Sequence, residues 1–288
     1  MGFGRTISSI PFGFDRHGRP LRAWRRRPVS RLRDCFAYPL VDGPGLGLLI
    51  GLPPFLAIMA LPVLDLIVRF SPENALNPVN LLILPFSLPL VTSFTLTSGY
   101  LLLFLGRTLE SSSIGEEDHP RWPIWDRVEI LEEIGRWAWA GLLGIAVGGI
   151  PAGLYATSVG LSSRWSLAAF AVLVVAGLSY AQMALIAALL HDTPLAANPV
   201  TIGRALVLIG RANVAPSLLI GGTLAIVLSA WYFVLFHSPS VEAGVLGLWA
   251  CWVLTLYAAM AIVRILGTTY HRHCDALGWF NGRSRRAR

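Results

Sequence analysis

Residues 165–190 read WSLAAFAVLVVAGLSYAQMALIAALL and contain no charged side chain. A helix of this length, rising about 1.5 Å per residue, crosses the ~30 Å hydrocarbon core of a bilayer. Five further apolar stretches are long enough to do the same. They lie at about 46–70, 81–105, 137–160, 214–237 and 243–267. The sequence therefore predicts an all-α, polytopic membrane helix bundle with about six transmembrane helices.

The composition of the whole chain indicates the same class. Hydrophobic residues make up 55% of the 288 residues and charged residues 14%, and the mean hydropathy is +0.62. A soluble domain carries about 25% charged residues on average. The composition therefore excludes an ordinary soluble globule, a disordered chain, a collagen and a coiled coil.

Three prolines interrupt the first apolar stretch, namely Pro53, Pro54 and Pro62. Proline lacks a backbone N–H and kinks a helix, although neighbouring groups in a membrane protein can satisfy the freed carbonyls. Two alternatives follow for this stretch: a kinked helix that spans the membrane fully, or a split or re-entrant segment.

The arginines are distributed unevenly around the predicted spans. With the N-terminus in the cytoplasm, 21 of the 23 basic residues fall on the inner side, and Arg69 and Arg164 fall on the outer side. Basic residues favour the cytoplasmic side of a membrane. We therefore expect a multi-pass protein of a bacterial inner membrane with both termini in the cytoplasm.

This orientation divides the chain into three parts. An arginine-rich cytoplasmic segment covers 1–40, a transmembrane domain covers 41–267, and a basic cytoplasmic tail covers 268–288. The transmembrane domain includes a cytoplasmic loop at 106–136. Because the basic clusters flank apolar spans, they predict contacts with anionic lipid head groups and not with nucleic acid.

The loop at 106–136 has a pattern of its own. Asp126 and Glu129 have the spacing of a capping box, and apolar residues recur at helical intervals after them. This pattern predicts a short helix lying at the inner surface and leading into the third span. Trp122 and Trp125 precede it and are expected at head-group depth, where tryptophan is enriched.

A second short surface helix is predicted at 198–213. Asn198 and Pro199 suit the first positions of a helix, and apolar residues follow at helical spacing. Arg204 and Arg211 are seven residues apart and share one face. The pattern is typical of a helix that lies in the membrane interface.

Polar side chains within the spans are the candidate functional groups: Asp65, Arg69, Thr92 and Gln182. Ionisable groups inside a membrane are costly and are therefore functional candidates. Asp65 and Arg69, four residues apart, can equally form a simple ion pair near the outer interface. Thr92, which lies in a hydroxyl-rich stretch, and Gln182 either line a polar path or form hydrogen bonds between helices.

The third span contains several glycines around Pro151. Gly144 and Gly148 have GxxxG spacing, as do Gly149 and Gly153. Glycines at this spacing let helices approach closely. The alternative is a broken helix that exposes its backbone to a substrate, as in transporters.

The sequence offers no complete metal site. His271, His273 and Cys274 lie close together, but a structural zinc site needs four ligands and no second pair has a suitable spacing. The remaining cysteines, Cys35 and Cys251, do not complete a disulfide framework. No nucleotide-binding loop or catalytic triad motif is present. We therefore expect no metal, no cofactor and no enzymatic activity.

Three pieces of the first half resemble an uncharacterised prokaryotic integral-membrane family, one of the named domains of unknown function. The pieces are Phe36-Ala37-Tyr38-Pro39 leading through Asp42 and Gly43 into the first span, Gly99-Tyr100 followed by Arg107, and Gly115-Glu116-Glu117 followed by Pro120, Trp122 and Trp125-Asp126. In that family a Gly-Tyr helix end precedes an acidic Gly-Glu stretch and a loop rich in Pro, Trp and Asp. The resemblance covers about residues 34–150. It implies a bacterial inner-membrane protein with no established reaction, and it supplies no catalytic residues.

Three functions remain open at this point. The first is a non-enzymatic component of a membrane complex, which binds a membrane-protein partner or a second copy of the chain. The second is a small-solute transporter or channel that uses its proline-broken helices. The third is a membrane-embedded lipid-modifying enzyme, which would need a cluster of polar groups near the inner leaflet, such as His191, Asp192, Glu132 and Glu133.

Overall fold

The structure, a computed structural model, describes residues 32–41, 43–69, 78–114, 122–191, 193–237 and 241–277. These ranges are almost entirely helical and contain no strand. The helices in chain order are α1 (Leu32–Val41), α2 (Gly43–Arg69), α3 (Pro78–Ile114), α4 (Arg127–Gly144), η1 (Ile145–Gly149), α5 (Ile150–Val159), α6 (Arg164–Leu190), η2 (Pro194–Ala196), α7 (Pro199–Ile209), η3 (Gly210–Asn213), α8 (Val214–His237) and α9 (Val241–Leu277).

Six helical segments are long and apolar enough to cross a membrane. They are Gly43–Ala60, Leu88–Ser113, Arg127–Val159, Arg164–Leu190, Val214–His237 and Ala243–Cys274. The predicted all-α bundle with six transmembrane helices is confirmed. The protein is therefore a multi-pass membrane protein, because each of these segments is long and apolar enough to cross the hydrocarbon core.

The first span is one unbroken helix in spite of its prolines. α2 continues from Gly43 to Arg69, so the split or re-entrant alternative is not observed. α3 also extends further than predicted and ends only at Ile114. The first part of the predicted loop at 106–136 is thus the cytoplasm-directed end of a long helix in the expected orientation.

The last part of that predicted loop is helical as well. Asp126 caps the start of α4, where its side chain accepts a hydrogen bond of 2.9 Å from the backbone N–H of Val128. The predicted separate surface helix is therefore the beginning of the third span itself. Glu129 does not complete the capping box but pairs with Arg107 of α3.

The third span changes its winding just before Pro151. Residues Ile145–Gly149 form a π-helical turn between α4 and α5. A proline ring collides with the carbonyl group one turn earlier in a regular α-helix, and a wider turn removes this collision. The continuous helix formed by α4, η1 and α5 therefore extends to Val159. Gly160, with a φ of 74°, ends it.

Glycines make the crossing between the third and fourth spans unusually close. A Cβ atom placed on Gly177 of α6 would lie 2.7 Å from the carbonyl oxygen of Gly144 and 2.7 Å from the Cα atom of Gly148. No larger residue fits without moving one helix. The predicted close packing at Gly144 and Gly148 is present.

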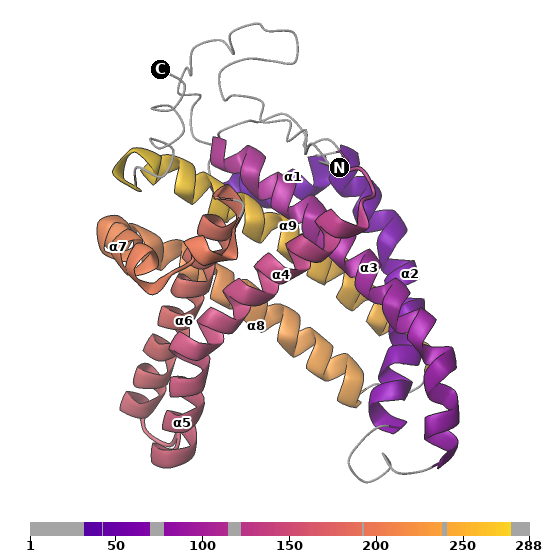
Figure 1. The fold of residues 1–288 in the computed structure, drawn as a ribbon. Coiled ribbons are helices and arrows are strands. Elements are labelled where there is room, and N and C mark those ends of the chain that lie inside the picture. The colour runs from indigo at the N-terminus through magenta and orange to yellow at the C-terminus, as the bar shows by residue number, and fades with distance from the viewer. Residues whose placement is uncertain are drawn as a thin grey trace, which may run out of the picture.

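The helices are arranged as two hairpins that diverge from a common core. In Figure 1 the α5–α6 hairpin and the α2–α3 hairpin point away from each other, α8 runs between them, and α9 passes behind α3 and packs against α2 and α3. The core lies at the opposite end, near α1, where α3, α6 and α9 pack together. Its largest buried side chains include Phe104, Leu109, Met183, Ile186, Met260 and Tyr270.

The second predicted surface helix, α7, forms as expected. Asn198 caps it by accepting a 2.8 Å hydrogen bond from the backbone N–H of Thr201. Ile202, Ala205 and Ile209 are buried against the bundle, and Arg204 is exposed. The helix lies across the ends of the longer helices (Figure 1).

Candidate functional site

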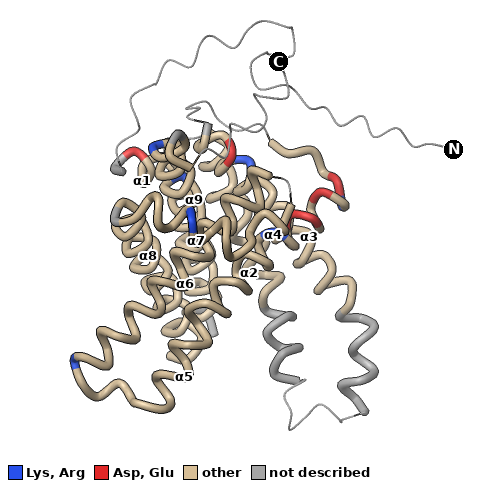
Figure 2. The backbone as a smooth tube through the Cα atoms, turned by 60° about the vertical axis from the view of Figure 1, so that its left-hand side comes forward, with Lys and Arg blue, Asp and Glu red and all other residues tan. Residues whose placement is uncertain are grey.

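Charged residues gather at one end of the bundle. Figure 2 shows acidic and basic positions concentrated around α1, α7 and the adjoining ends of α3, α4 and α9. Arg164 lies away from this end, since it begins α6 at the tip of the α5–α6 hairpin. The charged end is therefore the place where polar chemistry is possible, and it contains two clusters of buried polar side chains.

The first cluster is built around Glu133 of α4, whose side chain is 2% exposed. Trp137 donates its indole N–H to Oε1 over 2.9 Å, and Arg136 donates to Oε2 over 3.1 Å. The carboxylate lies directly against Gly106 of α3, where any Cβ atom would overlap it. A buried carboxylate needs such compensation, because desolvating a charge is costly.

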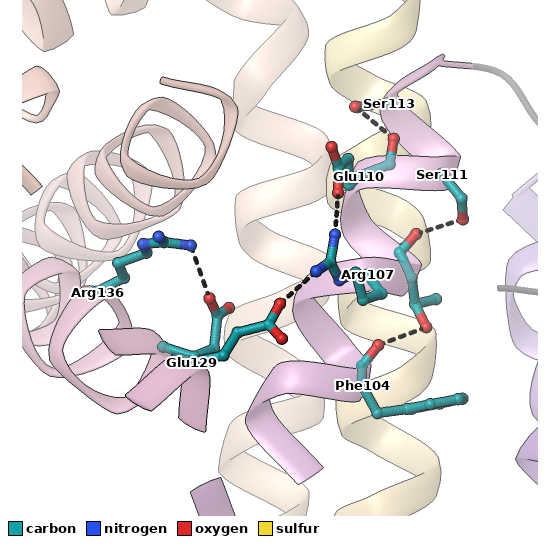
Figure 3. A network of polar contacts seen from close by, with 9 residues as sticks. Phe104, Arg107, Glu110, Ser111, Ser113, Glu129 and Arg136 are labelled. Carbon is teal, nitrogen blue, oxygen red and sulfur yellow. Dashed lines mark hydrogen bonds and ion pairs between the residues drawn. The ribbon is translucent and has the colours of Figure 1, made fainter. Parts of the chain in front are cut away.

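Arg107 extends this cluster to the surface. It pairs with Glu129 of α4 and with Glu110 of its own helix, the latter over 3.5 Å. Figure 3 shows its guanidinium pointing between the two carboxylates. The ion pair between Arg107 and Glu129 holds the end of α3 against the start of α4.

An aromatic cluster covers the same contact. The Tyr100 hydroxyl donates to the carbonyl oxygen of Pro123 over 2.8 Å, and its ring lies 5.2 Å from that of Trp125. Trp122 contacts Phe104 at the same centroid distance of 5.2 Å. Trp122 and Trp125 remain half exposed, which is compatible with their predicted position at head-group depth.

The second cluster joins α1, α3 and α9 around Arg264, which is 6% exposed. Its Nη1 donates to the Ser112 hydroxyl of α3 over 2.9 Å, and its guanidinium lies 4.8 Å above the ring of Tyr38 of α1. The Tyr257 hydroxyl donates to the carbonyl oxygen of Phe36 over 2.8 Å. These contacts hold the short helix α1 against the end of α9.

Arg264 is not among the candidate residues that the sequence predicts. It lies in the last turn of the predicted sixth span, 243–267, but α9 continues to Leu277 and buries it. The sequence does indicate that this arginine belongs to a helix that continues, because apolar residues lie on both sides of it.

A smaller polar group lies between α6 and α8, further from the charged end. The Ser179 hydroxyl donates to Ser217 over 2.9 Å, and Ser217 donates to Oε1 of Gln182 over 3.1 Å. The Gln182 side chain is 5% exposed, and its Nε2 has no hydrogen-bond partner among the described residues. Gln182 thus forms a hydrogen bond between two helices, which is one of its two predicted roles. Its Nε2 amide group remains without a partner among the described residues.

The other predicted site residues do not meet at one place. Thr92 of α3 is exposed, and its hydroxyl donates to the carbonyl oxygen of Leu88 in its own helix over 2.8 Å. Asp65 and Arg69 are in the last turns of α2, and their side chains lie outside the described set, as does that of Arg211. The structure therefore brings Gln182 together with α8 but not with Thr92.

The histidines near the end of α9 bond to backbone carbonyls. His271 Nδ1 lies 3.2 Å from the Ser113 carbonyl oxygen, and His273 Nδ1 lies 2.8 Å from that of Thr269. Among the residues that the structure describes, no group of three or more His, Cys, Asp or Glu side chains is placed to hold a metal ion. Asp192, one of the acidic groups of the enzyme hypothesis, lies outside the described residues.

A scan against protein-family models and searches of curated proteins and of solved structures find no match to this chain.

Proposed function

We propose that this chain is a non-enzymatic subunit of a membrane complex and that α8 is its contact helix. The observation that carries the proposal is the exposure of α8. Of its residues Val214–His237, all of which the structure describes, Ser217, Ile220 and Val227 are buried. A helix packed into a bundle normally buries an apolar stripe of three to four residues in every two turns.

The exposed side of α8 has the residues that helix contacts in membranes use. Small residues recur on it at intervals of three, four and seven, at Ala215, Gly222, Ala225 and Ser229, and all are exposed. Lipid gives helices no hydrophobic reason to associate, so close packing through small residues is a main source of affinity. The stripe and the low burial together favour a transmembrane helix of another chain as the neighbour of α8.

The expected location is the inner membrane of a bacterium, with both termini in the cytoplasm. The arginine bias supports this orientation, and the resemblance of residues 34–150 to the uncharacterised prokaryotic family supports the location. The charged end, with its basic flanks, would then contact anionic head groups at the inner leaflet.

The proposal can be tested by photo-crosslinking in native membranes. A photoreactive amino acid at Ala225 should give an adduct of higher mass than the 31.3 kDa chain, and Gly222→Leu should reduce its yield. The same probe at Val172, an exposed position of α6, serves as the control. An adduct of twice the chain mass identifies a second copy, and another mass identifies a partner. Equal yields at both positions, or no protein adduct at all, would contradict the proposal.

A transporter is the second candidate, and the unsatisfied amide of Gln182 favours it. An unpaired buried donor costs free energy unless a water or a solute satisfies it. Reconstituted vesicles should then show flux of a small polar solute that Gln182→Leu abolishes. Absence of flux across a broad panel of solutes would exclude this alternative.

A further inference from the structure

An open pocket lies beside the first turns of α4, next to η2. Its volume is about 550 Å³, and its walls are formed by Glu132, Gly135, Arg136, Trp139, Pro194 and Leu195. The pocket thus combines a carboxylate, a guanidinium and an indole with apolar side chains. Trp139 takes no part in the contacts that fasten α3 to α4, and Glu132 is linked to them only through its ion pair with Arg136.

The length of the third span gives an expected depth for the pocket in the bilayer. α4, η1 and α5 form one helical rod that ends at Gly160. At about 1.5 Å per residue, Trp139 is ~30 Å from Gly160, which equals the thickness of the hydrocarbon core. When the turn at Gly160 occupies one interface, Trp139 occupies the other. The turn of α4 that holds Glu132 and Arg136 then extends into the head-group layer.

The charges around the pocket favour a head group with both a cationic and an anionic part. The Glu132 side chain is 62% exposed and pairs with Arg136 over 3.6 Å. Arg136 also donates to Glu133, but that carboxylate is buried against Gly106 and does not line the pocket, so this wall has one carboxylate and one guanidinium. The charged side chains of the lining therefore have no net charge, and they suit a zwitterionic head group better than a head group whose only charge is negative.

Trp139 adds a second feature that suits a cation. It is 42% exposed and lines the same pocket as Glu132. The face of an indole ring attracts ammonium groups electrostatically. A single indole beside a carboxylate suits a primary ammonium better than a quaternary one, because a primary ammonium can also donate hydrogen bonds to the carboxylate.

We propose that this pocket binds an aminophospholipid, whose head group contains both a primary ammonium and a phosphate. The ammonium group lies between Glu132 and the ring of Trp139. Pro194 and Leu195 of the η2 wall contact the glycerol and the first acyl carbons, which the open side of the pocket admits from the bilayer. The site is separate from α8, so it does not depend on the proposed complex.

The test measures lipid binding to the full chain purified in mild detergent. Native mass spectrometry with added phosphatidylethanolamine, phosphatidylcholine and phosphatidylglycerol should show the tightest binding for phosphatidylethanolamine. Glu132→Gln and Trp139→Leu should each weaken that binding about two- to fivefold, the range expected for an exposed ion pair or cation–π contact. Binding of phosphatidylglycerol should not fall in either variant.

Matched controls are available in the same chain. Glu110→Gln removes another partly exposed carboxylate that pairs with an arginine at the charged end, and Trp165→Leu removes an exposed tryptophan at the far tip of the hairpin. Neither should change binding of phosphatidylethanolamine. Leu195→Gln, at an exposed position of η2, tests the apolar wall independently and should also weaken binding. Thermal unfolding without added lipid establishes that each variant is folded.

Three results would overturn the proposal. The first is binding of phosphatidylglycerol as tight as that of phosphatidylethanolamine. The second is an equal loss of binding in the control and pocket variants, or no loss in the pocket variants. The third concerns the source of the ammonium group: if soluble glycerophosphoethanolamine competes as effectively as the lipid, the ligand is a soluble ammonium compound and not a phospholipid.

Discussion

Gly106 and Glu133 form a matched pair across the contact between α3 and α4. The carboxylate occupies the space that a Cβ atom at position 106 would need, and its two oxygens accept from Trp137 and Arg136. Position 106 of α3 must therefore lack a Cβ atom, and the carboxylate of Glu133 on α4 must keep its hydrogen-bond donors. Neither residue can change alone without disturbing the contact.

Substitution of this pair should give a strongly non-additive result. Gly106→Ala should lower the free energy of unfolding by about 1–3 kcal/mol through overpacking, and Glu133→Ala should lower it by about 3–5 kcal/mol because Arg136 loses its buried partner. In the double variant the alanine at 106 no longer meets the carboxylate. The double variant should therefore be more stable than the sum of the single effects predicts, by about 0.5–3 kcal/mol.

Denaturant unfolding in detergent measures these differences. Gly135→Ala is the control, since a Cβ atom at position 135 of α4 would contact nothing within 4 Å, and it should leave stability unchanged or slightly raised. Simple additivity of the Gly106 and Glu133 variants would show that the two residues do not meet in the folded protein.

The polar residues also show which contacts of single residues can be predicted from the sequence. Asp126 and Asn198 were correctly predicted as helix caps, because capping depends on neighbours in the chain. The contact of Arg264 with Ser112 joins residues 152 positions apart, and the contact of Gly106 with Glu133 depends on which helices pack together. Hydrophobic periodicity gives the length of a helix but not its neighbours, so these contacts could not be predicted.

Helix α1 is an element held in place by a few specific bonds. The Tyr257 hydroxyl binds the Phe36 carbonyl oxygen, and the Cys35 thiol lies 3.8 Å from the Thr268 hydroxyl. A helix of ten residues is too short to be stable on its own in water. Its structure must therefore depend on α9.

Loss of the Tyr257 bond should loosen α1 selectively. In Tyr257→Phe the carbonyl of Phe36 loses its partner, at a cost of about 1–3 kcal/mol. Hydrogen–deuterium exchange should then be faster in residues 32–41 and unchanged in α6. Tyr232→Phe, an exposed tyrosine of α8, is the control. Equal exchange in Tyr257→Phe and the wild-type protein would show that this bond does not hold α1.

The crossing of the third and fourth spans is a close contact between the backbones of two helices. Gly177→Ala should destabilise the protein by about 1–3 kcal/mol, because its Cβ atom would collide with the backbone of Gly144 and Gly148. Gly153→Ala, at a position with nothing within 4 Å, should be neutral. Thermal unfolding in detergent compares the two. Equal midpoints would contradict the close approach of these helices.

On the scale of the whole molecule, the six spans place both described ends of the chain on one side. α1 contacts the last turns of α9, whereas the turn at 160–163 lies at the opposite end of the α5–α6 hairpin (Figure 1). Apolar length alone predicted this architecture, since each span needs about 20 apolar residues. The divergence of the two hairpins was not predicted, because it depends on the angles at which helices cross.

Cysteine labelling should report this topology. In a chain whose three cysteines are replaced by serine, Ser162→Cys in the outer turn should react with a membrane-impermeant maleimide in intact cells. Ile124→Cys, an exposed position between α3 and α4, should react only after permeabilisation. Labelling of both positions from the same side would contradict the six-span fold, and a reversed pattern would contradict the proposed orientation.

The contact of Gly177 with Gly144 and Gly148 also has a mechanical consequence. It is a point about which the α5–α6 hairpin can pivot, and the tip of the hairpin at Arg164 is ~20 Å away along the helix. The backbones of the two helices touch there, and the side chain nearest to Gly144 is the small one of Ala181, so few side chains interlock to resist a change of crossing angle. A slight tilt at this point would move the tip of the hairpin sideways within the membrane.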